Sequence, residues 1–292
     1  MKRIQIIITL VIIVAFAIIA LQKKHHTTNE SPDHKTELAN TEKVDSTDIK
    51  KFWHLYNYAT DFRIDGLNKQ AAKWYEKALK INPLHQDGLY YLGSVYFKMK
   101  QYDKARECWN KLKNINPGSS RAFSQLGNLY GCYTNAAWFD AAKASDFYEK
   151  ANNLNKEETG PLLNLSKIAL LSGNLKQSNT YLTEVLKTND NSPSAFFLQG
   201  YFNWRKGNIK AASQQIRHAR NAVRNTKYAH LEGATKNGNS PLAQENFECD
   251  PVSEFIADIL AQGFKVNDEI TNIIYQQFDQ KLNNILKRQQ SS

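Results

Sequence analysis

The sequence predicts an all-α protein in which a helical solenoid of about five helix–turn–helix repeats follows one N-terminal transmembrane helix and a disordered polar tether. Three observations support this prediction. An apolar run begins at residue 4, small residues return at intervals of 34 positions beyond residue 50, and an apolar stripe of helical period lies near the C-terminus. We expect the C-terminal stripe to belong to helices that cap the solenoid.

The first 22 residues form the predicted membrane anchor. Residues Ile4–Leu21 are apolar at all but two positions, and two lysines follow. Eighteen helical residues span roughly 27 Å, which is enough to cross the hydrocarbon core of a bilayer. A cleaved signal peptide is the alternative, with Ala15–Ala17 as its best cleavage site, but the apolar run continues for four residues beyond that site. We therefore favour an uncleaved signal-anchor.

The orientation of this anchor follows from its short N-terminal tail. Positive charges on the two sides nearly balance, so the positive-inside rule alone does not decide the orientation. A short tail that precedes a long soluble domain usually stays in the cytoplasm. We expect a single-pass protein of the inner (cytoplasmic) membrane with its soluble domain in the periplasm. Residues 23–49 are polar and bury too little surface to offset their ordering entropy, so they are the predicted disordered linker.

Residues 50–226 are the predicted solenoid, because two series of small residues share one spacing. The first series has steps of 34, 34, 39 and 34, and the second has steps of 34, 39, 34 and 34. The members of the two series are Ala59, Gly93, Gly127, Ser166 and Gly200, and Ala71, Ala105, Ala144, Ser178 and Ala212. Five extra residues therefore lie inside the third unit. The predicted units are 52–85, 86–119, 120–158, 159–192 and 193–226.

The pattern around these small residues resembles the signature of the tetratricopeptide-repeat (TPR) family, and the layout is similar to its membrane-anchored bacterial members. The second unit carries the signature without a gap, at Leu89, Leu92, Gly93, Tyr96, Ala105, Trp109, Leu112 and Pro117. The fourth and fifth units match more weakly and lack the closing proline. The resemblance implies a stack of paired helices in which each unit buries its apolar face against a neighbour. It also implies that the first helices line a concave groove that binds another polypeptide.

The family's groove positions give the candidate protein-binding residues: Tyr56, Arg63, Tyr90, Phe97, Arg121, Asn128, Lys167, Phe197, Tyr201 and Trp204. Aromatic side chains and arginine carry much of the energy of protein interfaces, so this set suits a peptide or helix laid along the groove. In an alternative interpretation, several of these residues contact the tether or the C-terminal helices instead of a partner. TPR domains that clamp acidic chaperone C-termini place Lys and Asn where this chain has Tyr56 and Thr60, so that clamp is absent.

A second candidate surface is basic. The chain has a formal net charge of +10, and the stretch from Asn191 to Leu231 contains no Asp or Glu. Its basic face consists of Lys210, Arg217, Arg220 and Arg224 on one side of a predicted helix. It is either a solvated outer face or a contact for an acidic protein or anionic lipid. Nucleic acid is not an expected partner.

The C-terminal region is predicted as a loop at 227–249 and helices at 250–292. Asp250 and Pro251 are typical of a helix start, and an apolar stripe follows residue 267. These helices either fold back on the fifth unit as a cap or dock on a partner or second copy. The oligomeric state stays open.

No motif for catalysis, cofactor binding or metal binding is present, so we expect no enzyme activity, cofactor or metal. Three cysteines are too few and too scattered to predict a disulfide framework, and at least one is a free thiol. The predicted function is a scaffold or adaptor in cell-envelope complex assembly, by analogy with the layout of anchored TPR proteins of cytochrome c maturation, pilus or secretion assembly and periplasmic chaperone networks. The alternatives are a lipid-binding or acidic-partner module acting through the basic face, or a regulatory subunit of a membrane enzyme.

Overall fold

The structure is a computed structural model that describes residues 46–229 and 249–290. The chain divides into two compact units, residues 1–50 and 51–292. The predicted anchor at 1–22 lies outside the described residues, as does the predicted linker up to residue 45. Within the described ranges, none of the helices combines the length and the apolar character that crossing a bilayer requires.

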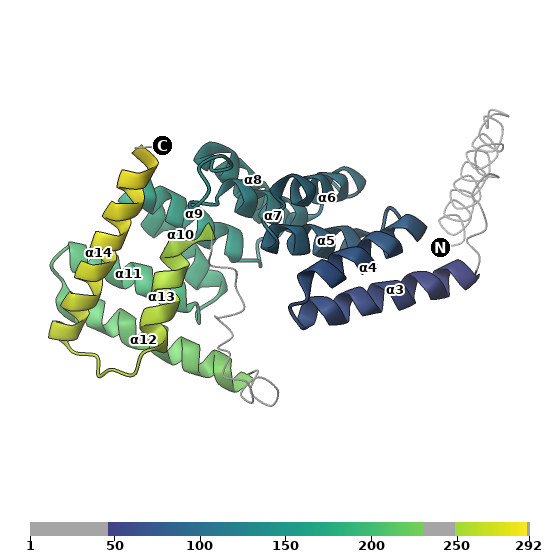
Figure 1. Ribbon diagram of the computed structural model, residues 1–292. Coiled ribbons are helices and arrows are strands. Elements are labelled where there is room, and N and C mark those ends of the chain that lie inside the picture. The colour runs from purple at the N-terminus through teal and green to yellow at the C-terminus, as the bar shows by residue number, and fades with distance from the viewer. Residues whose placement is uncertain (1–45, 230–248, 291–292) are drawn as a thin grey trace, which may run out of the picture. The chain divides into compact units, whose positions relative to one another are not determined.

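Five successive helix pairs lie between residues 46 and 229, and no strand occurs among the described residues (Figure 1). The pairs are α3 (Ser46–Ile64) with α4 (Asn68–Ile81), α5 (Gln86–Lys98) with α6 (Tyr102–Ile115), α7 (Ser120–Tyr130) with α8 (Ala141–Leu154), α9 (Gly160–Leu171) with α10 (Leu175–Thr188), and α11 (Pro193–Arg205) with α12 (Ile209–Ala229). The prediction of an all-α solenoid of TPR-like helix pairs is confirmed.

Two predicted boundaries were wrong by a few residues. Helix α3 begins at Ser46, inside the predicted linker, and Asp48 in its first turn stabilises the N-terminal end of the helix dipole. Helix α12 continues to Ala229, inside the predicted loop. The sequence contains no glycine or proline between the start of α12 and Gly233, so no helix-breaking residue ends this helix at the predicted boundary.

The helices of a pair approach closely because the first presents a small residue to a large ring on the second. A Cβ atom added at Gly93 would overlap the indole of Trp109, and one added at Gly127 would lie 2.6 Å from the ring of Tyr148. Trp109 is fully buried, and its indole nitrogen donates to the carbonyl of Tyr90 at 3.3 Å. The interval of 34 residues therefore reflects a steric requirement that recurs in successive pairs, namely a small residue opposite a large ring.

The two C-terminal helices, α13 (Pro251–Ala261) and α14 (Asp268–Gln290), pack against the end of this stack (Figure 1). Helix α14 contacts α12 and α11, just as α7 contacts α6 and α5, and α9 contacts α8 and α7. It thus takes the place that the first helix of a sixth repeat would occupy. The hydroxyl of Tyr275 donates to the carbonyl of Phe197 at 3.0 Å, which fixes α14 on the fifth pair. Of the two interpretations of these helices, the structure shows the one in which they fold back.

Candidate protein-binding groove

A groove of about 750 Å³ runs along the first helices of the repeats. Its walls come mainly from α5, α7 and α9, with Arg63 from α3 at one end and Cys249, Asp250 and Ser253 at the other. Three half-buried aromatic residues, Tyr90, Tyr91 and Phe97, project from α5 and give the groove an apolar wall. Of the predicted residues, Arg63, Tyr90, Phe97, Asn128 and Lys167 do line this groove.

The end of the groove nearest α3 carries two cations. The guanidinium of Arg63 lies 4.4 Å from the centre of the Tyr91 ring, and its Nε donates to the Tyr75 hydroxyl at 3.4 Å. Lys98, in the last turn of α5, is exposed. Within the part of the chain that the structure describes, neither cation pairs with a carboxylate.

The rim beside this end is held by an ion pair between neighbouring repeats. Arg121 of α7 donates to the carboxylate of Asp87 on α5 at 2.5 Å, and its guanidinium lies 4.7 Å from the centre of the Tyr90 ring. Gln125 donates to the Tyr90 hydroxyl at 3.1 Å. Both members of the ion pair are nearly half exposed, so the pair contributes little to stability and mainly orients Tyr90.

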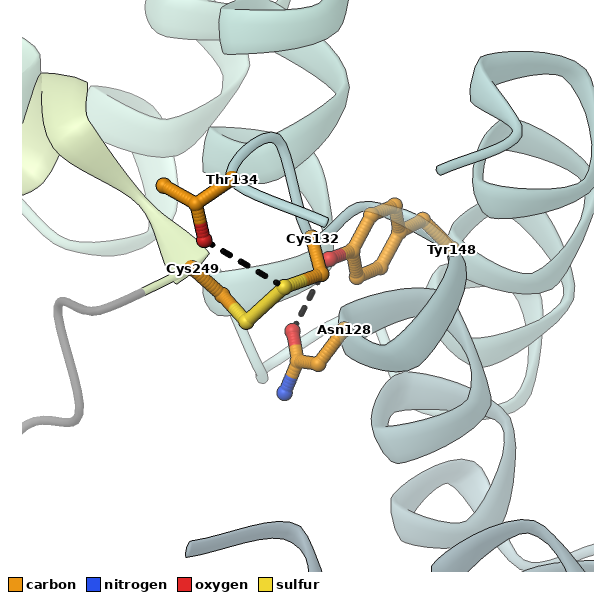
Figure 2. The surroundings of a disulfide bond; sticks show 5 residues. All are labelled: Asn128, Cys132, Thr134, Tyr148 and Cys249. Carbon is orange, nitrogen blue, oxygen red and sulfur yellow. Dashed lines mark hydrogen bonds between the residues drawn. A yellow bond between two sulfur atoms is a disulfide. The ribbon is translucent and has the colours of Figure 1, made fainter. Parts of the chain in front are cut away.

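Amide side chains form the floor in the middle of the groove. The hydroxyl of Tyr148 donates to Asn128 Oδ1 at 2.8 Å, which Figure 2 shows beside the disulfide, and Asn164 Nδ2 donates to the same oxygen at 3.2 Å. Asn128 in turn donates to Gln125 at 3.3 Å. This network spans α7, α8 and α9, so it fixes the register of three successive helices.

The far end of the groove is occupied by the chain itself. Lys167 on α9 is only 5% exposed, and its ammonium donates to Asp250 Oδ2 at 2.6 Å, to Ser253 Oγ at 2.7 Å and to Asn164 Oδ1 at 2.9 Å. Burial opposes ionisation of the Asp250 carboxyl, but attraction to Lys167 and the hydrogen bonds from Lys167 and Ser253 together lower its pKa below the ordinary value. The prediction that Lys167 faces a partner is therefore corrected, because its donors are used within the chain.

A disulfide fastens the same end. Cys132 lies in the extended loop of the third repeat, residues 131–140, and bonds to Cys249, which directly precedes α13 (Figure 2). The backbone N–H of Tyr133 donates to the carbonyl of Cys249 at 3.1 Å. The two cysteines are 117 residues apart, so their spacing did not predict this bond. The sequence analysis expected no disulfide framework, and the structure adds one disulfide that it did not predict. Cys108 is the free thiol.

Three aromatic residues predicted for the groove lie under α14 instead. Phe197 and Tyr201 have 0% and 2% of their surface exposed. The Tyr201 hydroxyl donates to Asp279 at 2.6 Å, and the Trp204 indole donates to Asn272 at 2.8 Å. Phe197 and Tyr201 are therefore corrected from partner-facing to interior positions, and Trp204 is half-buried against α14, because the chain's own C-terminal helices cover this part of the fifth repeat.

The remaining predicted groove residues lie at the margin. Tyr56 is half-buried and its ring packs against those of Tyr75 and His85, outside the groove lining. Arg121 stands on the rim described above. The lining residues that the sequence analysis missed include Tyr91, Lys98, Gln125 and Asn164. Each lies one, three or four positions from a predicted residue on the same helix, so a wider reading of each helix face would have included them.

The basic face is partly used inside the molecule. Arg220 donates to the carbonyls of Phe264 and Gln262, the latter at 3.1 Å, and Arg217 donates to the carbonyl of Val266 at 3.3 Å. These two arginines hold the loop that joins α13 to α14. Lys210 and Arg224 are exposed. Two of the four residues of the predicted basic face are thus bonded within the chain.

In the described ranges 46–229 and 249–290, no group of three His, Cys, Asp or Glu side chains is placed so that it could hold a metal ion. The arrangement offers contact surface, aromatic rings and two cations without a carboxylate partner among the described residues, and these features suit the binding of a polypeptide.

Among curated proteins, the chain is distantly similar to a much longer one. Anaphase-promoting complex subunit 3 of Schizosaccharomyces pombe is 26% identical over 163 residues, which cover 53% of this chain and 24% of that protein. The chain thus spans about a quarter of the length of the curated relative that it matches.

Solved structures share the fold. The pilF protein of Pseudomonas aeruginosa has a TM-score of 0.53 and 17% identity, over 84% of this chain and 99% of that one. A double mutant of MamA from RS-1 has a TM-score of 0.50 and 13% identity, over 61% and 97%. Residues 86–119, the second helix pair, match the tetratricopeptide repeat family. The second helix pair is thus similar to a tetratricopeptide repeat, and the chain shares the all-α helical-solenoid fold of these structures.

Proposed function

We propose that the protein is a scaffold that binds a segment of a partner protein in the groove of its first four repeats. The observation that carries this proposal is the contrast between the two ends of the concave face. The chain's own helices fill the fifth repeat, whereas Tyr90, Tyr91 and Phe97 line an open groove of about 750 Å³. Half-buried aromatic residues held by a rigid helix stack supply contact area at low entropic cost.

We further propose that the scaffold is anchored in the inner membrane by Ile4–Leu21 and faces the periplasm, where it serves assembly of a cell-envelope complex. The apolar run is long enough for a transmembrane helix. The Cys132–Cys249 disulfide supports the placement, because such bonds persist in the periplasm and are rare in the cytosol.

In-cell photo-cross-linking tests the binding proposal. A photoreactive phenylalanine analogue replaces Tyr90 in the groove, and the matched control replaces Tyr181, a half-buried tyrosine on the second helix α10. We expect one specific adduct with a partner protein from position 90 and none from position 181. Equal labelling from both positions, or no adduct from position 90, would rule out the groove as the binding site.

Reporter fusions after Ser292 test the membrane placement. We expect a fused alkaline phosphatase, which needs an oxidising compartment, to be active and a cytoplasm-only fluorescent reporter to be dark. The opposite pair of results would place the solenoid in the cytoplasm.

A further inference from the structure

We propose that the open end of the groove recognises an acidic segment of the partner protein, in which carboxylates lie next to apolar side chains. This inference rests on the proposed function and adds the chemistry of the ligand. Two features carry it: the charge balance of the groove lining, and the carboxylate with which the chain itself pairs the third cation of the lining, Lys167.

The charge balance of the lining is positive. Its ionisable members of fixed charge at neutral pH are Arg63, Lys98 and Lys167 against Asp250 alone. Asp250 is already paired with Lys167. Arg63 and Lys98 therefore stand in the groove with no carboxylate partner among the described residues. A half-buried guanidinium gains more from a carboxylate than an exposed one, because its water shell is already incomplete.

The occupied end shows what this concave face accepts. There the ammonium of Lys167 pairs with the carboxylate of Asp250 and donates to the hydroxyl of Ser253, both of which line the groove. The cation at this end of the groove is thus met by a carboxylate. At the open end, Arg63 and Lys98 supply cations and Phe97 supplies an apolar wall.

The aromatic wall sets the position of the apolar contacts. Tyr90 is held by Gln125 and Arg121, and Tyr91 lies under the guanidinium of Arg63. A carboxylate that approaches Arg63 thereby brings its neighbouring residues over these rings. The arrangement therefore favours a ligand that carries both a carboxylate and apolar side chains, since only such a ligand contacts both the cation and the aromatic rings.

A peptide selection on the purified full-length chain tests this inference. A phage library of random dodecapeptides is selected on the wild type, on Lys98→Gln, and on the double variant Arg63→Gln/Lys98→Gln. Lys98 is exposed and forms no ion pair among the described residues, so Lys98→Gln leaves the fold intact. The matched control is Lys111→Gln/Lys150→Gln, which removes two exposed positive charges from the second helices α6 and α8.

We expect the wild type to select peptides enriched in Asp and Glu beside apolar residues. The best of these should bind the groove double variant about tenfold more weakly or worse, and Lys98→Gln severalfold more weakly, with less than about a twofold change in the control. Each selected peptide is also cross-linked to the photoreactive analogue at position 90, which reports whether it lies in the groove.

The outcomes separate this inference from the proposed function. Peptides that cross-link at position 90 without acidic enrichment would overturn the acidic ligand and leave groove binding intact. Failure of every selected peptide to cross-link there would overturn both. Vesicles containing phosphatidylglycerol serve as a second probe. Vesicle binding that requires Arg63 and Lys98, without any peptide selection, would assign the charges to a membrane surface and contradict the inference.

Discussion

The ammonium of Lys167 and the carboxylate of Asp250, 83 residues apart in sequence, form an ion pair of 2.6 Å at the inner end of the groove. Lys167 is 5% exposed and Asp250 is 25% exposed, so the pair is largely shielded from water. It joins the fourth repeat to the first turn of α13, where Asp250 also caps the helix by accepting from the Ser253 N–H at 3.0 Å. The pair therefore sets where the open groove ends.

Asp250→Asn is expected to destabilise the protein by about 3 kcal/mol, because it leaves the buried ammonium of Lys167 without a counter-charge. Asparagine keeps the helix cap, so the loss reports the ion pair rather than the helix start. Urea denaturation followed by circular dichroism measures it. The matched control, Asp103→Asn, removes an ion pair with Arg106 whose members are 73% and 39% exposed, and should cost less than about 0.5 kcal/mol. Equal effects of the two changes would contradict the role of burial.

Stability is expected to fall in acid through the same pair. Because the pKa of Asp250 is lower in the folded protein than in the unfolded chain, its contribution is complete above the unfolded value of about 3.9 and is lost as pH falls through the folded value. The wild type should therefore lose stability more steeply than Asp250→Asn between about pH 5 and about pH 2. Urea midpoints across this range give the two profiles, and parallel profiles would argue against the predicted linkage.

Thiol counting should find one free cysteine. Alkylation of the unfolded, unreduced protein is expected to modify Cys108 alone, and reduction beforehand should raise the number of modified sites to all three cysteines in the sequence. In the folded protein Cys108 should react slowly, because burial, followed by the nearby Glu107, raises the pKa of its thiol to about 12. Mass spectrometry gives the counts. Three reactive thiols before reduction would exclude the disulfide.

Loss of the disulfide is expected to loosen α13. The double variant Cys132→Ser/Cys249→Ser should lower stability by about 2–4 kcal/mol, since it removes a cross-link between the third repeat and the C-terminal helices. Hydrogen exchange should rise first in α13 and in residues 131–140, with α5 and α6 unchanged. Cys108→Ser is the control and should leave exchange in α13 at the wild-type level. An unchanged α13 in the double variant would show that the ion pair suffices.

Gly200→Ala is expected to displace α14 from the fifth repeat. An added Cβ would overlap the hydroxyl of Tyr275 and approach Gln215 Cβ to 3.0 Å, so the helices must separate. We expect a loss of about 1–3 kcal/mol in urea denaturation, and adding Tyr275→Phe should restore part of it by removing the overlapping oxygen. Gly160→Ala, where an added Cβ meets nothing within 4 Å, should be neutral. A neutral Gly200→Ala would contradict the close contact.

Periodicity in the sequence determined the solenoid. Gly93 and Trp109, or Gly127 and the ring of Tyr148, meet inside one helix pair, and a steric requirement that returns in every repeat leaves its spacing in the sequence. The same register placed Arg63, Tyr90, Phe97 and Asn128 on the groove, because helix periodicity and the repeat length together fix which face a side chain takes.

Only the tertiary structure decided where the groove ends. Phe197 and Tyr201 have the sequence features of groove residues, yet α14 buries them, and Lys167 looks like a partner-facing cation until α13 supplies Asp250. The bond between Cys132 and Cys249 is likewise a contact that only the tertiary structure shows. These contacts occur once, between segments that no repeat interval relates. They depend on how the C-terminal helices fold back on the repeats, and a local sequence pattern does not predict such long-range contacts.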